Sequence, residues 1–114
     1  MLVKSLANAL PYEAPNHRLI ESVRLLGMEP DGPTNFWVGH STVHPGGGAG
    51  PDASGIEKVY VVLSGRLTVT GGSQTQVLGA LDACRIPPNE TREFVNQGST
   101  PATLLVIMPY KATS

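Results

Sequence analysis

Three histidines are the side chains in this sequence that most readily perform acid–base or metal chemistry near neutral pH. His40 and His44 lie four residues apart in a segment that we predict to be a strand. Four residues of a strand span about 13 Å, so one ion cannot bridge both imidazoles without a bulge. We therefore predict two independent polar groups, with His44 as a candidate ligand-binding or acid–base residue. His17 precedes this strand and is expected at the surface.

A lysine, a tyrosine and an arginine form a second group of candidates. Lys58 and Tyr60 fall on one face of a predicted strand, and Arg92 and Phe94 fall on one face of another, because side chains alternate along a strand. We predict that these four side chains point into the interior of the protein. The Tyr60 hydroxyl either orients a ligand or serves core packing.

Two further features are predicted to carry no chemistry. The segment 45–55 (PGGGAGPDASG) contains five glycines but lacks the Lys-Ser/Thr ending of a phosphate-binding loop, so we expect a mobile loop. Cys84 has an apolar context and no neighbouring histidine, which favours a buried and unreactive thiol.

Short strands with frequent turns must position these side chains. Glycine and proline make up 13 and 10 of the 114 residues. They separate about eight short apolar segments at 19–27, 36–44, 58–63, 66–70, 74–78, 83–86, 92–96 and 102–108. This spacing predicts an all-β sandwich or barrel. Residues 1–16 are expected to form an N-terminal extension with one or two helical turns ended by Pro11, and residues 17–114 a single β domain.

Composition excludes several classes of function. Eight basic and nine acidic residues give a net charge of −1, which provides no basic surface for nucleic acid. A single cysteine cannot form an internal disulfide. No apolar run is long enough for a membrane-spanning helix, and the N-terminus is a poor secretion signal. We therefore expect a cytoplasmic protein with neither nucleic-acid nor membrane partners.

The segments KVYVVLSG and PPNETREFVN resemble the cupin superfamily over about residues 36–109. Gly65, which closes the first cupin motif, and Pro87 and Asn96 of the second motif match. The resemblance implies a double-stranded β-helix, the jelly-roll barrel of cupins. It also implies that Lys58 and Arg92 come from two facing strands and point into one pocket.

The metal ligands of the family are replaced in this sequence. Cupins hold a metal with three histidines and one carboxylate, and the corresponding positions here are Asp52, Ser54, Lys58 and Arg92. Two cations would repel a metal ion, so we expect no metal ligand and no cofactor. A divalent metal held in another way is the alternative.

Two readings of the cations follow from the resemblance. Asp52 can pair with Lys58 or Arg92 in a structural ion cluster. Alternatively, Arg92 and Lys58 bind the carboxylate of a small molecule, with Tyr60, His44 and Asp52 around it. A lysine desolvated beside an arginine has a lowered pKa and can act as a base or an amine nucleophile.

Three functions therefore stay open at this point. We favour a metal-free protein that binds a small anionic molecule. The alternatives are a cupin enzyme, either metal-dependent (isomerase, decarboxylase or dioxygenase) or using Lys58, and a structural or partner-binding barrel. A homodimer is expected, because Val59, Val61 and Leu63 form an apolar face that a lone barrel leaves exposed. Trp37 is expected on the outer face or at a dimer seam.

Overall fold

Strands dominate a computed structural model of the protein, which describes residues 1–111. The elements in chain order are η1 (Leu6–Asn8), β1 (Leu10–Tyr12), β2 (His17–Leu26), β3 (Phe36–Asp52), β4 (Lys58–Ser64), β5 (Leu67–Gly71), β6 (Gln74–Leu78), β7 (Ala83–Ile86), β8 (Arg92–Val95) and β9 (Ala102–Pro109). In this part of the chain, no helix is long and apolar enough to span a membrane.

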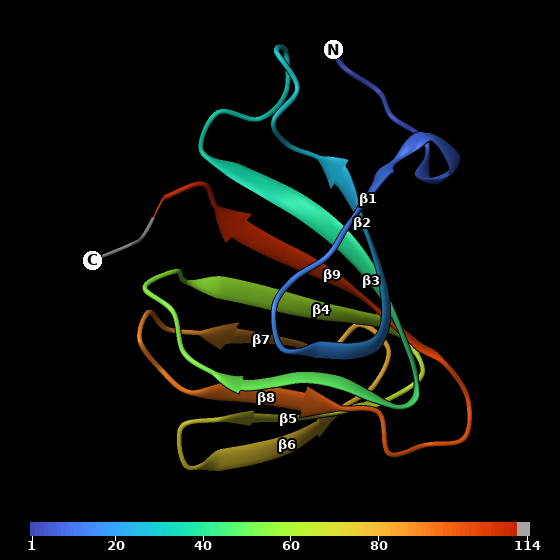
Figure 1. The fold of residues 1–114 in the computed structure, drawn as a ribbon, viewed down its shortest axis with the longest axis vertical. Helices are drawn as coiled ribbons and strands as arrows, with labels where there is room; N and C mark the ends of the chain where they lie inside the picture. Colours follow the sequence, from blue (N-terminus) through green and yellow to red (C-terminus); the bar gives the residue numbers. More distant parts are fainter. Residues whose placement is uncertain (112–114) are drawn as a thin grey trace.

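The strands form one antiparallel, nearly closed barrel, as the jelly-roll prediction requires. Neighbours follow the order β6-β5-β8-β3-β9-β4-β7, and β2 pairs with β3 and with β1 (Figure 1). The long strand β3 joins the two halves of the barrel. Its first part pairs with β9 through Trp37↔Met108 and Ser41↔Leu104, and its last part pairs with β8 through Ala49↔Phe94 and Asp52↔Arg92.

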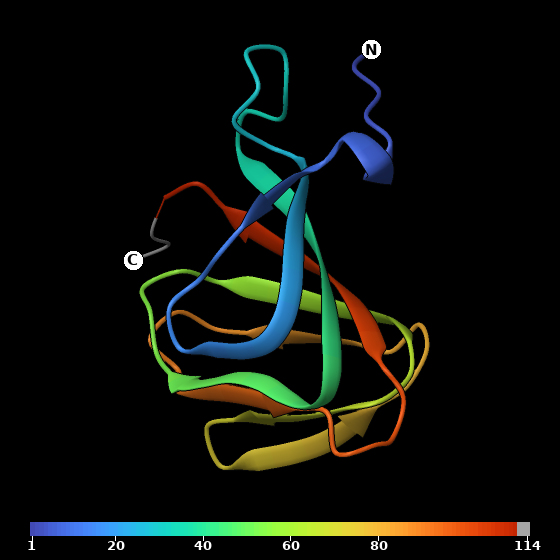
Figure 2. The ribbon, with the colours of Figure 1, turned by 45° about the vertical axis from the view of Figure 1, so that its right-hand side comes forward.

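Alternation along the strands directs one set of side chains into the barrel. In β3, the odd-numbered residues of 37–43 are buried, as are residues 58, 60 and 62 of β4, 92 and 94 of β8, and 102, 104 and 106 of β9. The residues between them are partly exposed. The buried apolar residues form one core: Val43, Ala49, Tyr60, Val62, Leu67, Val69, Leu78, Ile86, Phe94, Ala102, Leu104 and Val106. Figure 2 shows the barrel of strands that contributes this core, turned by 45° from the view of Figure 1.

Gly65 and Asn96, which match the cupin motifs, have structural roles. Gly65 has φ +73°, and a Cβ atom there would lie 2.8 Å from the Cα of Ala102, so only glycine fits this turn. The buried amide of Asn96 donates to the carbonyl oxygens of Val43 and Thr100 at 2.9 and 2.8 Å, and its oxygen accepts from the Gly98 N–H. This side chain therefore holds the β8–β9 connection against β3.

The segment 45–55 is not the loop that the sequence predicted. Strand β3 continues through it to Asp52, and residues 47–50 are buried. The glycines here allow close contact between strands, since a Cβ atom at Gly48 would lie 2.2 Å from the Phe94 carbonyl oxygen. Glycine content therefore indicates tight packing of β3 against β8 at this place.

Residues 1–16 hold a single helical turn, one of the two lengths expected, but Pro11 does not end it. They contain the three-residue η1, and Pro11 lies within β1, whose residues pair with β2. The connection between β1 and β2 crosses the barrel in front of β4 (Figure 1). This segment therefore contributes to the enclosure of the interior.

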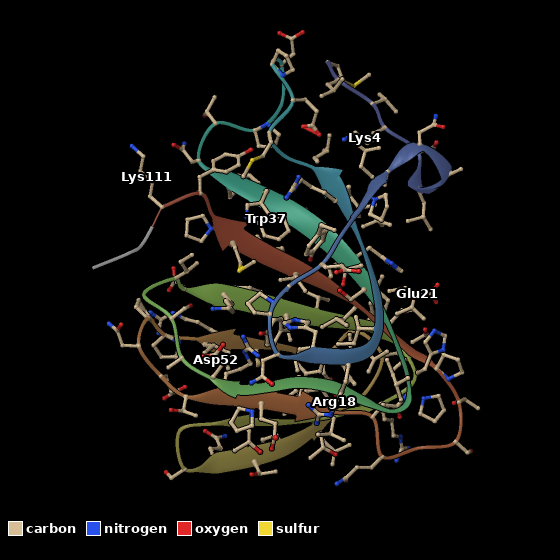
Figure 3. The ribbon with its side chains drawn as sticks, in the orientation of Figure 1. Lys4, Arg18, Glu21, Trp37, Asp52 and Lys111 are labelled. Atoms are coloured by element: carbon tan, nitrogen blue, oxygen red, sulfur yellow. The ribbon has the colours of Figure 1, made fainter. Side chains whose placement is uncertain are left out.

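Trp37 lies inside and not on the outer face. It is 8% exposed, and its ring meets that of Tyr12 edge-on at 5.4 Å. The guanidinium of Arg24 lies over both rings, 5.5 Å from the centroid of Tyr12 and 5.4 Å from that of Trp37. Figure 3 shows Trp37 on the part of β3 that pairs with β9. Alternation along β3 does not determine which of its two faces is buried. The packing of Tyr12 and Arg24 on Trp37 buries the face that carries Trp37.

Candidate functional site

A cavity of about 220 Å³ opens into the barrel between β3, β4, β8 and the β1–β2 connection. Apolar and aromatic side chains form most of its wall, and a few polar groups converge on it, which is typical of small-molecule sites. The lining residues are Tyr12, Ala14, Pro15, His17, Ser41, Asp52, Ser54, Ile56, Lys58, Tyr60, Arg92, Phe94, Val106 and Met108.

The structure brings together the four residues at the cupin ligand positions. Asp52 ends β3, Ser54 lies in the following turn, Lys58 begins β4 and Arg92 begins β8, and all four line the cavity. Asp52 lies on the part of β3 that runs along β8 (Figure 3) and is paired in register with Arg92. Tyr60 lines the same wall.

Lys58 is held inside the barrel by neutral groups. Its side chain is buried, with the residue 8% exposed. Its Nζ donates to the Ser54 hydroxyl at 2.6 Å and to the Ile56 carbonyl oxygen at 3.2 Å. Burial is the main cause that lowers the pKa of Lys58, and the nearby Arg92 guanidinium lowers it further, whereas Asp52 opposes both effects.

Arg92 is buried to the same degree, and two of its three guanidinium nitrogens lack acceptors, while a side-chain hydrogen bond links it to Tyr60. Within residues 1–111, Nε and Nη1 are buried without any hydrogen-bond partner. Neither Arg92 nor Lys58 forms an ion pair with a carboxylate of these residues. Asp52 instead accepts the Ala53 N–H at 2.8 Å. The structural ion cluster considered above is therefore not formed in the described part of the chain.

Aromatic rings stand beside the two cations. The Tyr60 ring packs edge-on against that of Phe94 with 5.4 Å between the ring centroids, and the His17 ring also meets Phe94 edge-on, at 6.4 Å. Burial raises the pKa of Tyr60, while the Arg92 charge opposes that rise. Tyr60 therefore keeps its phenolic proton at neutral pH and can donate a hydrogen bond.

His17 was missed as a site residue, because we expected it at the surface. It lines the cavity, and its Nδ1 donates to the Pro15 carbonyl oxygen at 2.7 Å, which leaves Nε2 as the acceptor of the neutral ring. Burial lowers the pKa of His17, and the Arg92 charge contributes to the lowering. His17 lies opposite the buried Ala49 in the pairing of β2 with β3. The sequence around His17 carries no signal for this pairing, because Ala49 is 32 residues away.

His44, which we expected around the bound carboxylate, does not line the cavity. His44 and His40 lie on the same face of β3, and this is the outer face, because the odd-numbered residues of 37–43, which alternate with them, are the buried ones. There the Nε2 of His44 lies 2.7 Å from a carboxylate oxygen of Glu21, and both side chains are exposed. Cys84 is half-buried, and burial raises the pKa of its thiol.

The donor set of the cavity does not fit the metal of cupins. The four ligand positions provide one carboxylate, one hydroxyl, one ammonium and one guanidinium. In their charged forms, the ammonium and the guanidinium donate hydrogen bonds, offer no lone pair to a metal ion and repel it. Moreover, residues 1–111 contain no group of three His, Cys, Asp or Glu side chains placed to hold a metal. We therefore derive no chemistry through a metal at this site.

Comparison with known proteins gives several likenesses. A protein of Mycobacterium tuberculosis named as a beta-D-galactosidase is 40% identical over 99 residues, which is 87% of this chain and 85% of that protein. The polyketide cyclase RemF from Streptomyces resistomycificus has a TM-score of 0.86 at 22% identity, covering 100% of this chain and 82% of that one. A predicted oxalate decarboxylase from Thermotoga maritima has a TM-score of 0.78 at 22% identity, covering 96% and 98%.

The family model described as the cupin domain matches residues 39–108. The match includes β4 and β8, which carry Lys58 and Arg92, and it extends nearly to the end of β9. Together with the barrel topology and the structural neighbours, it shows that this chain belongs to the cupin superfamily.

Proposed function

We propose that the cavity binds a small molecule that carries a carboxylate group, without a transition metal in the site. The observation that carries this proposal is Arg92, whose Nε and Nη1 are buried without acceptors among residues 1–111. A buried donor that stays unpaired costs about 1–3 kcal/mol, and more for a charged group. A carboxylate is the partner that matches a guanidinium in charge and in geometry.

Arg24 also has an unpaired buried nitrogen, but its surroundings differ from those of Arg92. The Nε of Arg24 is also buried without a hydrogen-bond partner, but its guanidinium lies over the rings of Tyr12 and Trp37. Cation–π contacts of this kind compensate part of the lost hydration. Arg92, by contrast, opens onto the cavity, where the neighbouring cation Lys58 adds positive charge.

A thermal-shift experiment with small carboxylates tests the proposal. Acetate, pyruvate, lactate and citrate should raise the melting temperature, whereas the neutral amides of the same acids should not. A ligand at one hundred times its Kd stabilises the folded state by about 2.7 kcal/mol. The Arg92→Met variant should lose the response, and Arg66→Met, which changes an exposed arginine, should keep it. A response that survives in Arg92→Met would contradict the proposal.

Hydrolysis of a β-D-galactoside is the second candidate, supported by the 40% identical relative that is named as a beta-D-galactosidase. Glycosidases commonly use two carboxyl groups. Among the described lining residues, the cavity offers one carboxylate, Asp52. The test is release of nitrophenol from nitrophenyl β-D-galactoside, and the Asp52→Asn variant should abolish it. Activity that is unchanged in Asp52→Asn would show that this cavity is not responsible.

A further inference from the structure

Lys58 has the surroundings of an amine nucleophile and not those of a structural ion. It lies in the cavity wall at the start of β4, beside Arg92 of β8. Within residues 1–111 it has no carboxylate partner, although a buried ammonium ordinarily requires one. Burial and the Arg92 charge both favour the uncharged amine, as their lowering of its pKa indicates.

The hydrogen bonds of Lys58 leave its lone pair free. Lys58 reacts after its ammonium loses a proton, which burial makes easier than in a free lysine, and the resulting amine has two hydrogens and one lone pair. The Ser54 hydroxyl at 2.6 Å and the Ile56 carbonyl oxygen at 3.2 Å provide two acceptors for the two hydrogens. These bonds fix the side chain, so the lone pair of Nζ keeps one direction. A fixed and desolvated amine of this kind attacks carbonyl carbons.

The other groups of the cavity suit a carbonyl compound that also carries a carboxylate. Arg92 provides unpaired donors for the carboxylate. Tyr60 lines the same cavity, and its phenolic O–H can donate to an oxygen. His17 holds its proton on Nδ1 and offers Nε2 as a proton acceptor. A 2-oxo acid has its carbonyl directly beside its carboxylate, which suits a cavity that Lys58 and Arg92 both line and in which their charges interact.

We propose that Lys58 forms a Schiff base with a small 2-oxo acid whose carboxylate is bound by Arg92; this inference rests on the proposed function. The Nζ lone pair forms a bond to the carbonyl carbon, and the C=O π pair moves to the oxygen. A proton passes from nitrogen to oxygen and gives a carbinolamine. Loss of the C–O bond, with a further proton, releases water and leaves the C=N bond. No oxidant or other co-reactant is needed.

Reductive trapping tests this inference. Pyruvate and sodium cyanoborohydride are added to the protein, and the modified lysine is located by peptide mass spectrometry. Hydride transfer to the imine carbon gives a secondary amine, so the mass increases by that of pyruvic acid less one oxygen atom. The chain has three lysines, so Lys4 and Lys111 serve as internal controls. We expect modification of Lys58 in preference to both, and competition by lactate, which has the carboxylate but no carbonyl.

Two variants separate covalent chemistry from binding. In Lys58→Met, the added mass should be absent while pyruvate still raises the melting temperature. In Arg92→Met, both the temperature response and the preference for Lys58 should be lost. An Arg92-dependent melting shift without preferential Lys58 modification would overturn the Schiff base and leave the proposed function standing. Absence of both effects in the wild-type protein would overturn both.

Discussion

Replacement of Arg92 by methionine should make the ligand-free protein more stable. The Arg92 guanidinium is buried with Nε and Nη1 unpaired among residues 1–111, and it lies beside a second cation, Lys58. Methionine keeps an unbranched stem of similar length for contact with the cavity wall, but it brings no charge and no donor. The variant therefore removes unfavourable terms from the folded state and loses no ion pair of the described residues.

The magnitude follows from the buried nitrogens. One buried unpaired donor costs about 1–3 kcal/mol, and replacement of buried ionic groups by apolar ones commonly stabilises a protein by about 1–4 kcal/mol. We therefore expect the free energy of unfolding to rise by about 1–3 kcal/mol. For a small domain, each kcal/mol corresponds to a melting-temperature change of about 4–8 °C.

Urea denaturation of dialysed protein measures this effect. Arg66→Met is the matched control, since Arg66 is exposed, and its change should stay within about 0.5 kcal/mol. With a bound carboxylate, the order should reverse, because only the wild-type protein gains binding energy. If ligand-free Arg92→Met is less stable than wild type by 1 kcal/mol or more, then Arg92 has favourable partners within the chain, and the argument for an anion site fails.

Three further predictions concern metal, assembly and pH. Elemental analysis of the purified protein should find no stoichiometric transition metal, since Lys58 and Arg92 occupy two ligand positions; about one iron, manganese, nickel or zinc per chain would refute this. Sedimentation should show a dimer of the 12.0 kDa chain that buries at least about 1,000 Å² in total. The reason is an apolar outer surface on which Val59 and Val61 of β4 pair with Ile107 and Leu105 of β9. A monomer at micromolar concentration would count against this prediction. Folding lowers the pKa of Lys58, so just below pH 10.5 the folded state binds fewer protons than the unfolded state. The free energy of unfolding of the wild type, relative to that of Lys58→Met, should therefore rise as the pH increases toward 10.5. A difference that does not change with pH would show that folding leaves the pKa of Lys58 unchanged.

Much of the site could be predicted from local sequence. Alternation along single strands places Lys58 with Tyr60 and Arg92 with Phe94, and the structure puts all four on one cavity. The cupin motifs also identified Gly65 and Asn96, because a positive φ and a buried amide bonded to three backbone groups each permit few residue types. The positive φ of Gly65 and the bonds of Asn96 to Gly98 and Thr100 are local requirements, so the motif residues are visible in the chain itself, although Gly65 also packs against Ala102 and Asn96 also bonds Val43.

Other features depended on contacts between distant segments. The sequence predicted a loop at 45–55, but β8 packs against these residues and extends β3 to Asp52. Trp37 was expected outside, yet Tyr12 and Arg24 cover it. His44 was expected near the ligand, and it pairs instead with Glu21 of β2. In each case the partner comes from another strand, and alternation does not say which face that strand covers.

The sequence by itself determined a β-rich chain of the cupin type and the replacement of its metal ligands by Asp52, Ser54, Lys58 and Arg92. Only the tertiary structure decided that Lys58 and Arg92 lack an acidic partner within residues 1–111 and that His17 joins them. The physical reason is that residue types and spacing fix which chemical groups a strand carries. The long-range register of β2 on β3 and of β3 on β8 fixes which of those groups meet.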